Sequence, residues 1–193
     1  MRADADIGLF ADDDMVYVTS YPEIVKKAFE EIPEADVIIF DLKYPQGGRP
    51  PITKIQRLSR RNCMRFGAAR FAVRLSRMHL NGVSFNLCFG GGAKYSSGED
   101  TLFLNDCFDK KLKVYAYPAV IAHLHDERES TWFQGYNDKF FFDKGVIYYL
   151  INRNFGGLIA GYHCIKHCKK YRSYGWLNAW KQMYNGFLFA KTN

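Results

Sequence analysis

The sequence predicts an α/β fold in which helices cover the faces of a β-sheet. Short apolar runs typical of buried strands alternate with amphipathic segments of helical spacing between residues 7 and 125. Of the 193 residues, 48% are hydrophobic and 24% are charged, which is the composition of a globular chain that can bury a core. Ligands of open α/β sheets gather beyond the carboxyl ends of the strands, and functional residues are therefore expected there.

The first elements are two strands with a helix between them. The run IGLFA (7–11) predicts a short buried strand, and DVIIFDL (36–42) predicts a second one. The segment TSYPEIVKKAFEEIPEA (19–35) has helical spacing, with Ser20 and Glu23 placed to form a capping box. A loop is expected over 44–51, followed by a basic stretch at 52–65 that has no clear periodicity.

The later elements continue the alternation. RFGAARFAVR (65–74) predicts a strand, and the next segment predicts a short helix that ends near Asn81 and Gly82. The glycine- and serine-rich segment 90–98 predicts a loop, EDTLFLNDCFDKKLK (99–113) an amphipathic helix, and VYAYPAVIAHLH (114–125) a strand. The remaining chain is helical, aromatic and basic. We therefore expect a domain over residues 1–150 and a helical extension over 151–193.

Charge is unevenly distributed along the chain, whose net charge is +7. Residues 1–41 contain eleven acidic and three basic side chains, whereas residues 42–98 contain eleven basic ones and no acid. Residues 151–193 contain seven basic side chains and again no acid. This asymmetry indicates an anionic partner, either phosphate groups or a membrane surface.

The cysteines and the apolar runs indicate the compartment. Five cysteines without a regular framework argue against a secreted disulfide scaffold and favour a reduced cytoplasmic setting. The opening MRADADIGLF lacks the apolar region of a signal peptide, and the apolar runs are too short to span a membrane.

Three adjacent carboxylates, Asp12, Asp13 and Asp14, follow the first predicted strand. Carboxylates packed this closely repel one another unless a cation neutralises them. Mg²⁺ and Mn²⁺ prefer oxygen ligands and commonly take one or two carboxylates together with phosphate oxygens. The triplet is therefore either a divalent-metal site or a solvated acidic turn.

A second acidic motif, Gly98-Glu99-Asp100, follows the 90–98 loop and opens a predicted helix. Acidic residues are favoured in the first turn of any helix by the helix dipole. A carboxylate at the edge of a cleft can also act as a general base, and glycine lets a substrate approach the backbone. Both interpretations fit the pattern.

Histidines occur in two patterns. His123 and His125 lie two residues apart at the end of a predicted strand and so share one face, where they are either surface residues or metal ligands. In YHCIKHCKK (162–170), histidines and cysteines repeat at i, i+4. A basic amphipathic helix explains this second pattern better than a zinc site, because no C-x-x-C pair accompanies it.

The order and spacing of these motifs resemble family 2 glycosyltransferases. The segments that carry the resemblance are LFADDDMVY (9–17), RFGAARFAVRLSRMHLNGVSFN (65–86), YSSGEDTLFLNDCFDKKLKVYAYP (95–118) and VIAHLHDERESTWFQGY (120–136). The resemblance covers most of residues 5–150. It implies the GT-A fold, a Rossmann-like α/β sandwich that binds nucleotide-diphospho-sugars, here N-terminally truncated and followed by a helical C-terminal extension.

The resemblance also implies roles at the donor site. Asp12 and Asp14 would hold a divalent cation, Mn²⁺ or Mg²⁺, that bridges the donor diphosphate, and Asp13 would contact ribose or sugar. His125 or His123 would complete the metal shell, and the resemblance does not choose between them.

On the acceptor side, Asp100 corresponds to the base of inverting members, with Gly98 and Glu99 beside it at the substrate. Trp132, in the segment STW, corresponds to an acceptor-side position and is a candidate platform for stacking on a sugar. An inverting transfer needs a base for the acceptor hydroxyl and neutralisation of the leaving diphosphate, and no covalent nucleophile. The arginines of the basic stretch, Arg57, Arg60, Arg61 and Arg65, either help to hold phosphate or form a solvated face.

The family's metal motif normally comes well into the domain, after elements that bind the nucleobase and ribose. Here it stands at residue 12. The resemblance therefore implies that an N-terminal nucleotide-binding portion is missing from this chain. The remaining strands would expose sheet edges and apolar surface. We expect the isolated chain to bind nucleotide-sugar poorly and to self-associate.

The leading hypothesis is a metal-assisted inverting glycosyltransferase of polysaccharide biosynthesis, with a UDP-sugar donor and a glycan or lipid-linked acceptor. The basic, aromatic tail suits peripheral contact with the inner face of the plasma membrane, and packing on the domain is the alternative. The competing function is an inactive glycosyltransferase remnant that acts only as an interaction module. Nucleic acid is not an expected partner, because residues 43–77 offer charge without a recognition motif.

Overall fold

The computed structural model describes residues 5–44, 50–124, 133 and 135–193. Packing divides the chain into two compact units. Unit 1 comprises residues 1–85 and 103–129, and unit 2 comprises residues 86–102 and 130–193. These bounds differ from a division at residue 150 because helix α5 (Asp138–Ile151) packs with the helices that follow it. The assignment of functional domains to 1–150 and 151–193 stays a prediction.

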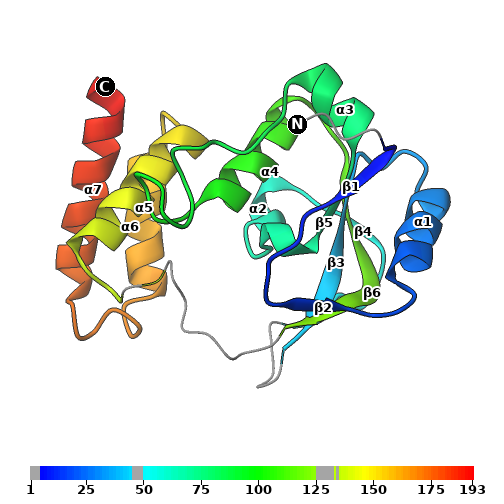
Figure 1. Cartoon of the computed structure of the whole chain (residues 1–193). Helices are drawn as coiled ribbons and strands as arrows, with labels where there is room; N and C mark the ends of the chain where they lie inside the picture. Colours follow the sequence, from blue (N-terminus) through cyan, green and yellow to red (C-terminus); the bar gives the residue numbers. More distant parts are fainter. Residues whose placement is uncertain (1–4, 45–49, 125–132, 134) are drawn as a thin grey trace. The chain divides into compact units, whose positions relative to one another are not determined.

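Unit 1 is built on a mixed β-sheet (Figure 1). The strands are β1 (Ile7–Leu9), β2 (Met15–Tyr17), β3 (Val37–Lys43), β4 (Gln56–Arg57), β5 (Phe71–Arg74) and β6 (Val114–Leu124). Their order is β1-β5-β3-β6-β2, and β4 also pairs with β6. The pairing of β3 with β6 is parallel, and the other pairings are antiparallel. An α/β fold is thus confirmed, with a sheet of mixed direction.

Strand direction decides where the aspartates lie. Because β5 is antiparallel to both β1 and β3, strands β1, β3 and β6 run in one direction and end at one edge of the sheet. Strand β2 begins at that edge, where Met15 pairs with Leu124 near the end of β6. Residues 10–14 connect β1 and β2, which lie at opposite sides of the sheet, and therefore cross this carboxyl edge.

Both faces of the sheet are buried, as the apolar run of β3 predicts. Val37 and Ile39 pack in one core with helix α4 (Glu99–Asp109), while Ile38 and Phe40 pack in the other with helix α1 (Tyr21–Glu31). Alternate residues of a strand point to opposite faces, so a continuous apolar run is needed to fill two cores.

Several local predictions in unit 1 need correction. Ser20 precedes α1 but makes no side-chain cap bond, so the capping box with Glu23 is wrong. Within 65–74 the strand occupies only β5, because residues 68–70 form a 3₁₀ turn (η1, Ala68–Arg70). The first strand spans three residues and is half-buried rather than buried. The basic stretch contains β4 and a short helix, α2 (Arg60–Cys63).

Helix α3 (Leu75–Asn81) ends as predicted. Gly82 at its C-terminus has φ +63°, a left-handed conformation that glycine adopts without a Cβ penalty, and its N–H donates to the His79 carbonyl. The predicted loop over 90–98 is present, and the helix predicted over 99–113 is present as α4 but ends at Asp109.

Unit 2 is helical and confirms the prediction for the end of the chain (Figure 1). Its helices are α5, α6 (Gly156–Lys166) and α7 (Trp176–Thr192). Glycines let α5 and α7 approach at backbone distance: a Cβ on Gly145 would lie 1.9 Å from the Met183 carbonyl oxygen, and one on Gly186 would lie 2.0 Å from that of Phe142. Larger residues at these two positions would force the helices apart.

Candidate functional site

The aspartate triplet lies in the turn between β1 and β2. The Asp12 N–H donates to Met15 Sδ at 3.4 Å, which closes the turn. Phe10, the residue after β1, places its ring 4.9 Å from Phe85 and 5.6 Å from Phe103 in the core of unit 1. A half-buried aromatic anchor therefore leads directly into carboxylates at the carboxyl edge of the sheet, as the sequence predicts for β1.

The electrostatics of this turn favour a cation. Partial burial raises the pKa of the Asp12 carboxyl, and the negative charges of Asp14 and Asp13 raise it further. The pKa of the Tyr17 hydroxyl is raised by burial, by Tyr21 and by Asp12. A positive ion at this point would relieve the repulsion that these shifts record.

Asp14 provides the most specific feature of the turn. Its Oδ1 atom is buried, and no hydrogen-bond donor among the described residues reaches it. Leaving a buried carboxylate oxygen without a partner costs about 1–3 kcal/mol or more. A cation is a chemically suitable partner for such an oxygen, so Asp14 and the adjacent Asp12 fit the two-carboxylate share of a Mg²⁺ or Mn²⁺ shell.

Further protein ligands do not converge there within the described part of the chain, in which no three His, Cys, Asp or Glu side chains form a group that could hold a metal. His123 is exposed on β6, opposite Val16 of β2. His125 and Trp132 lie outside the described residues. Their predicted roles, and that of Asp13 at the ribose or sugar, stay predictions.

Gly98, Glu99 and Asp100 belong to unit 2, at the start of α4, and all three are half-buried. Gly98 has φ +108°, and a Cβ on it would lie 2.4 Å from Ile147 Cδ1 of α5. Both the conformation and the close approach require glycine. The first turn of α4 is therefore set directly against α5.

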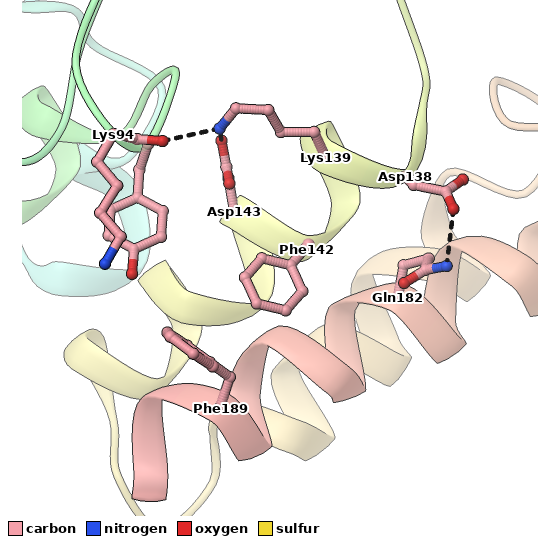
Figure 2. A pocket seen from close by; sticks show the side chains of 8 residues that line it. Lys94, Asp138, Lys139, Phe142, Asp143, Gln182 and Phe189 are labelled. Carbon is pink, nitrogen blue, oxygen red and sulfur yellow. Dashed lines mark hydrogen bonds and ion pairs between the residues drawn. The ribbon is translucent and has the colours of Figure 1, made fainter. Parts of the chain in front are cut away.

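A buried carboxylate that the sequence analysis missed also anchors this loop. Asp143 of α5 accepts hydrogen bonds from Ser96 N at 2.9 Å, Ser96 Oγ at 3.0 Å and Lys139 Nζ at 2.7 Å. Lys139 Nζ also donates to the Lys94 carbonyl at 2.8 Å (Figure 2). Asp143 thus positions the segment that leads into Asp100. The signal in the sequence is an acid inside the apolar run KFFFDKGVIYYL.

A cavity of about 450 Å³ opens beside this anchor in unit 2 (Figure 2). The rings of Tyr95, Phe142 and Phe189 line it, and the Lys94 ammonium stands 5.3 Å from the Tyr95 centroid and 5.8 Å from that of Phe189. Asp138 accepts from Gln182 Nε2 at 3.1 Å. The polar groups of the wall therefore bond to one another, and they do not converge on a common point as they do in most ligand sites.

The basic stretch of unit 1 is partly structural. Arg60 donates to Asn105 and Asp109 of α4, and the Arg65 guanidinium lies 4.6 Å from the Phe66 centroid. Arg57 is exposed in β4. Arg60 is therefore occupied by its helix contacts, and the prediction that the arginines hold phosphate stays open for the others.

The i, i+4 motif of α6 belongs to the core of unit 2. His163 Nε2 lies 2.6 Å from the Tyr171 hydroxyl, and burial, reinforced by nearby cations of which Lys144 is the strongest, lowers the pKa of His163 to about 3. Cys164 is buried with its Sγ 3.7 Å from Met183 Sδ, whereas Cys168 is exposed. Packing explains His163 and Cys164, which lie in α6, whereas His167 and Cys168 follow the end of that helix.

Comparison with known proteins identifies the fold. No protein-family model matches the chain, and no curated protein matches its sequence. Among solved structures, S. aureus TarS 1–349 in complex with UDP-GlcNAc has a TM-score of 0.58 at 14% identity, over 77% of this chain and 43% of that one. The complex with UDP has a TM-score of 0.54 over 77% and 41%. The longer S. aureus TarS structure has a TM-score of 0.55 over 86% and 29%.

TarS is a glycosyltransferase, and the chain thus has a glycosyltransferase-like fold. It spans less than half the length of these TarS structures. Membership of family 2, the GT-A subclass and the N-terminal truncation stay predictions.

Proposed function

We propose that this chain is part of a glycosyltransferase that uses a nucleotide-diphospho-sugar as donor, with a UDP-sugar the first candidate. One observation carries the proposal: Asp14 presents a buried oxygen to which no described residue donates, at the carboxyl edge of a sheet whose fold resembles a structure solved with UDP-GlcNAc. The finer assignment is a family 2, GT-A enzyme of polysaccharide biosynthesis. Its acceptor would be a glycan or a lipid-linked glycan.

Asp12 and Asp14 would hold the Mn²⁺ or Mg²⁺ ion of the donor complex. When bound, such an ion neutralises the charge that develops on the leaving diphosphate. One or two carboxylates are the common protein ligands of such an ion, so these two side chains would suffice to hold it. His123 and His125 are the candidates for any further protein ligand, and Asp13 is the candidate contact to ribose or sugar.

Asp100 would act as the general base, with Glu99 and Gly98 beside it in the substrate site. Its carboxylate accepts the proton of the acceptor hydroxyl while the acceptor oxygen bonds to the anomeric carbon. The bond from that carbon to the diphosphate breaks, and the nucleoside diphosphate leaves with the bonding electrons. Trp132 would stack on a sugar of the acceptor. Asp143 and Gly98 would act by positioning the first turn of α4.

Donor binding tests the proposal. Saturation-transfer NMR detects weak binding, which suits a chain expected to bind nucleotide-sugar poorly. With Mg²⁺ present, UDP-GlcNAc should give transfer signals that UDP displaces, and EDTA should remove them. Asp14→Asn should weaken binding at least about tenfold, because even changes to residues that only support a metal ligand cost about 10–100-fold in metal affinity. Asp6→Asn, at an exposed aspartate before β1, is the matched control. Equal binding by the Asp14→Asn variant and the wild type would refute the metal role.

A second variant separates the base from the donor site. Asp100→Asn should retain Mg²⁺-dependent donor binding and lose release of UDP from UDP-GlcNAc by at least about 100-fold, the usual contribution of a general base. Unchanged UDP release in Asp100→Asn would exclude this residue as the base and leave the donor assignment standing.

A further inference from the structure

Helix α6 is apolar on its outward face. Leu158, Tyr162 and Ile165 are 72%, 66% and 65% exposed and follow one another at helical spacing. The opposite face of the helix is buried, with Ala160 and Cys164 in the core of unit 2. A helix that is hydrophobic all round is normally covered on every side. The outward face of α6 therefore has the chemistry of a contact surface.

Helix α7 extends this surface with aromatic side chains. A Cβ on Gly161 of α6 would lie 3.5 Å from Trp180 Nε1, and one on Gly157 would lie 3.7 Å from Tyr184 Cε2. Both rings are 42% exposed, so the outward faces of the two helices adjoin. The combined surface, called here the α6–α7 face, consists of exposed apolar residues: Leu158, Tyr162, Ile165, Trp176, Leu177, Trp180 and Tyr184.

The segment that carries this face, residues 151–193, has charge of one sign. Residues 151–193 contain no acid, and all seven of their basic side chains are exposed: Arg153, Lys166, Lys169, Lys170, Arg172, Lys181 and Lys191. A second copy of the chain docked face to face would bring two such basic sets together, and like charges across an interface are costly. The charge therefore favours an anionic partner.

We propose that the α6–α7 face binds the surface of an anionic phospholipid bilayer. Aromatic and aliphatic residues flanked by Lys and Arg are the side chains that interfacial helices use, the apolar ones entering the acyl boundary and the basic ones meeting lipid phosphates. None of the helices in the described part of the chain is long and apolar enough to cross a membrane.

Vesicle co-sedimentation of the full chain tests this proposal without donor or metal, and so independently of the proposed function. Vesicles of phosphatidylcholine alone are compared with vesicles containing one quarter phosphatidylglycerol. The wild type should sediment with the anionic vesicles and release as NaCl is raised, because surface charge is screened. The fluorescence of Trp176 and Trp180 should shift to the blue on binding, since these rings leave water.

Two variants identify the surface. Leu158→Ser with Ile165→Ser removes exposed apolar groups, and Lys166→Glu with Lys169→Glu reverses exposed charges. Each pair should weaken binding to anionic vesicles at least about tenfold. The matched controls are Leu80→Ser, at a leucine of α3 that is 77% exposed, and Lys110→Glu, at an exposed lysine of unit 1. Both controls should bind as the wild type does.

Circular dichroism and sedimentation velocity of each variant complete the test. The proposal is overturned if the wild type ignores anionic vesicles, if it binds neutral vesicles equally well, or if Leu80→Ser weakens binding as much as the α6 pair. The proposal is also overturned if the variant Leu158→Ser with Ile165→Ser folds, binds vesicles as the wild type does and differs from it only in oligomeric state. The α6–α7 face would then contact a second copy of the chain.

Discussion

The two compact units handle charge in different ways. In unit 1, buried charges have partners: Arg70 and Asp41 form an ion pair at 3.2 Å with side chains 2% and 9% exposed, and Asp36 accepts from Arg77 Nε at 2.7 Å. In unit 2, Lys144 and His163 lie among other cations, and the effects on their pKa values come from burial and from positive neighbours.

The difference indicates what each unit depends on. Unit 1 uses opposite charges to fix its sheet. Asp14 Oδ1 differs, because among the side-chain nitrogen and oxygen atoms of the described residues it is the buried one that lacks a hydrogen-bond partner. Unit 2 also contains a buried carboxylate with a cationic partner, Asp143 with Lys139, but most of its described basic side chains are exposed, and burial and positive neighbours keep its half-buried His163 neutral. Breaking a charge pair should therefore harm unit 1, whereas adding positive charge should harm unit 2.

The largest effect is expected from Arg70→Ala. This change leaves the Asp41 carboxylate buried without its cation, and losing one partner of a buried ion pair costs about 3–5 kcal/mol of unfolding free energy. Urea unfolding can be followed by the reaction of a thiol reagent with Cys107, which is buried in unit 1. Lys26→Ala, which breaks the exposed 3.9 Å pair with Glu30, is the control and should cost at most about 0.5 kcal/mol. Equal costs for the two variants would contradict the comparison.

The second-largest effect is expected from lowering the pH, which should reduce the stability of unit 2. Burial and nearby cations lower the pKa of His163 from 6.5 to about 3, so between these values the unfolded chain binds a proton that the folded chain does not. Stability should therefore fall as pH drops from 6.5 towards 3, by up to about 1.4 kcal/mol per pH unit before solvent screening. The fluorescence of Trp176 and Trp180 reports this unfolding. His163→Gln should make the unfolding free energy depend less on pH, whereas the control His79→Gln, at an exposed histidine of α3, should leave this dependence unchanged. An unchanged pH dependence in His163→Gln would refute the role of His163 in the acid sensitivity of unit 2.

A smaller, local effect is expected at the start of α4. Gly98→Ala introduces a Cβ at φ +108° and against Ile147, which should cost about 1–3 kcal/mol. Gly91→Ala, where a Cβ would meet nothing within 4 Å, is the control. Hydrogen exchange of the Leu102 N–H, which donates to the Gly98 carbonyl at 2.9 Å, measures the change. Similar exchange in both variants would mean that close packing does not fix this turn.

Sequence periodicity predicted most elements because their apolar patterns are strong. The run VIIF of β3 and the glycine after α3 specify a doubly buried strand and a helix end on local grounds alone. The 3₁₀ turn before β5 was missed because residues 65–74 carry the apolar pattern of a single strand, and only Phe71–Arg74 pair in the sheet. The antiparallel strand pairings could not be predicted from the sequence either, because strand pairing depends on contacts between distant segments.

In the candidate site, too, features that depend on local sequence could be predicted and features that depend on distant contacts could not. Position after a strand was enough to single out Asp12, Asp13 and Asp14, because topology brings that strand end to the carboxyl edge of the sheet. Asp143 was missed because its role depends on Ser96, 47 positions earlier in the chain. An isolated acid in an apolar helical run shows only that some partner exists, and the fold decides which one.

The most direct test of the aspartate turn is Mn²⁺ titration of the ¹⁵N-labelled chain, because a bound paramagnetic ion broadens only nearby amide signals. In the wild type and in Asp6→Asn, Mn²⁺ should selectively broaden the amide signals of Asp12, Asp14 and Met15, and UDP should strengthen this broadening. In Asp14→Asn the broadening should be lost. Broadening that spares this turn at millimolar Mn²⁺ and UDP, or that persists unchanged in Asp14→Asn, would contradict the account.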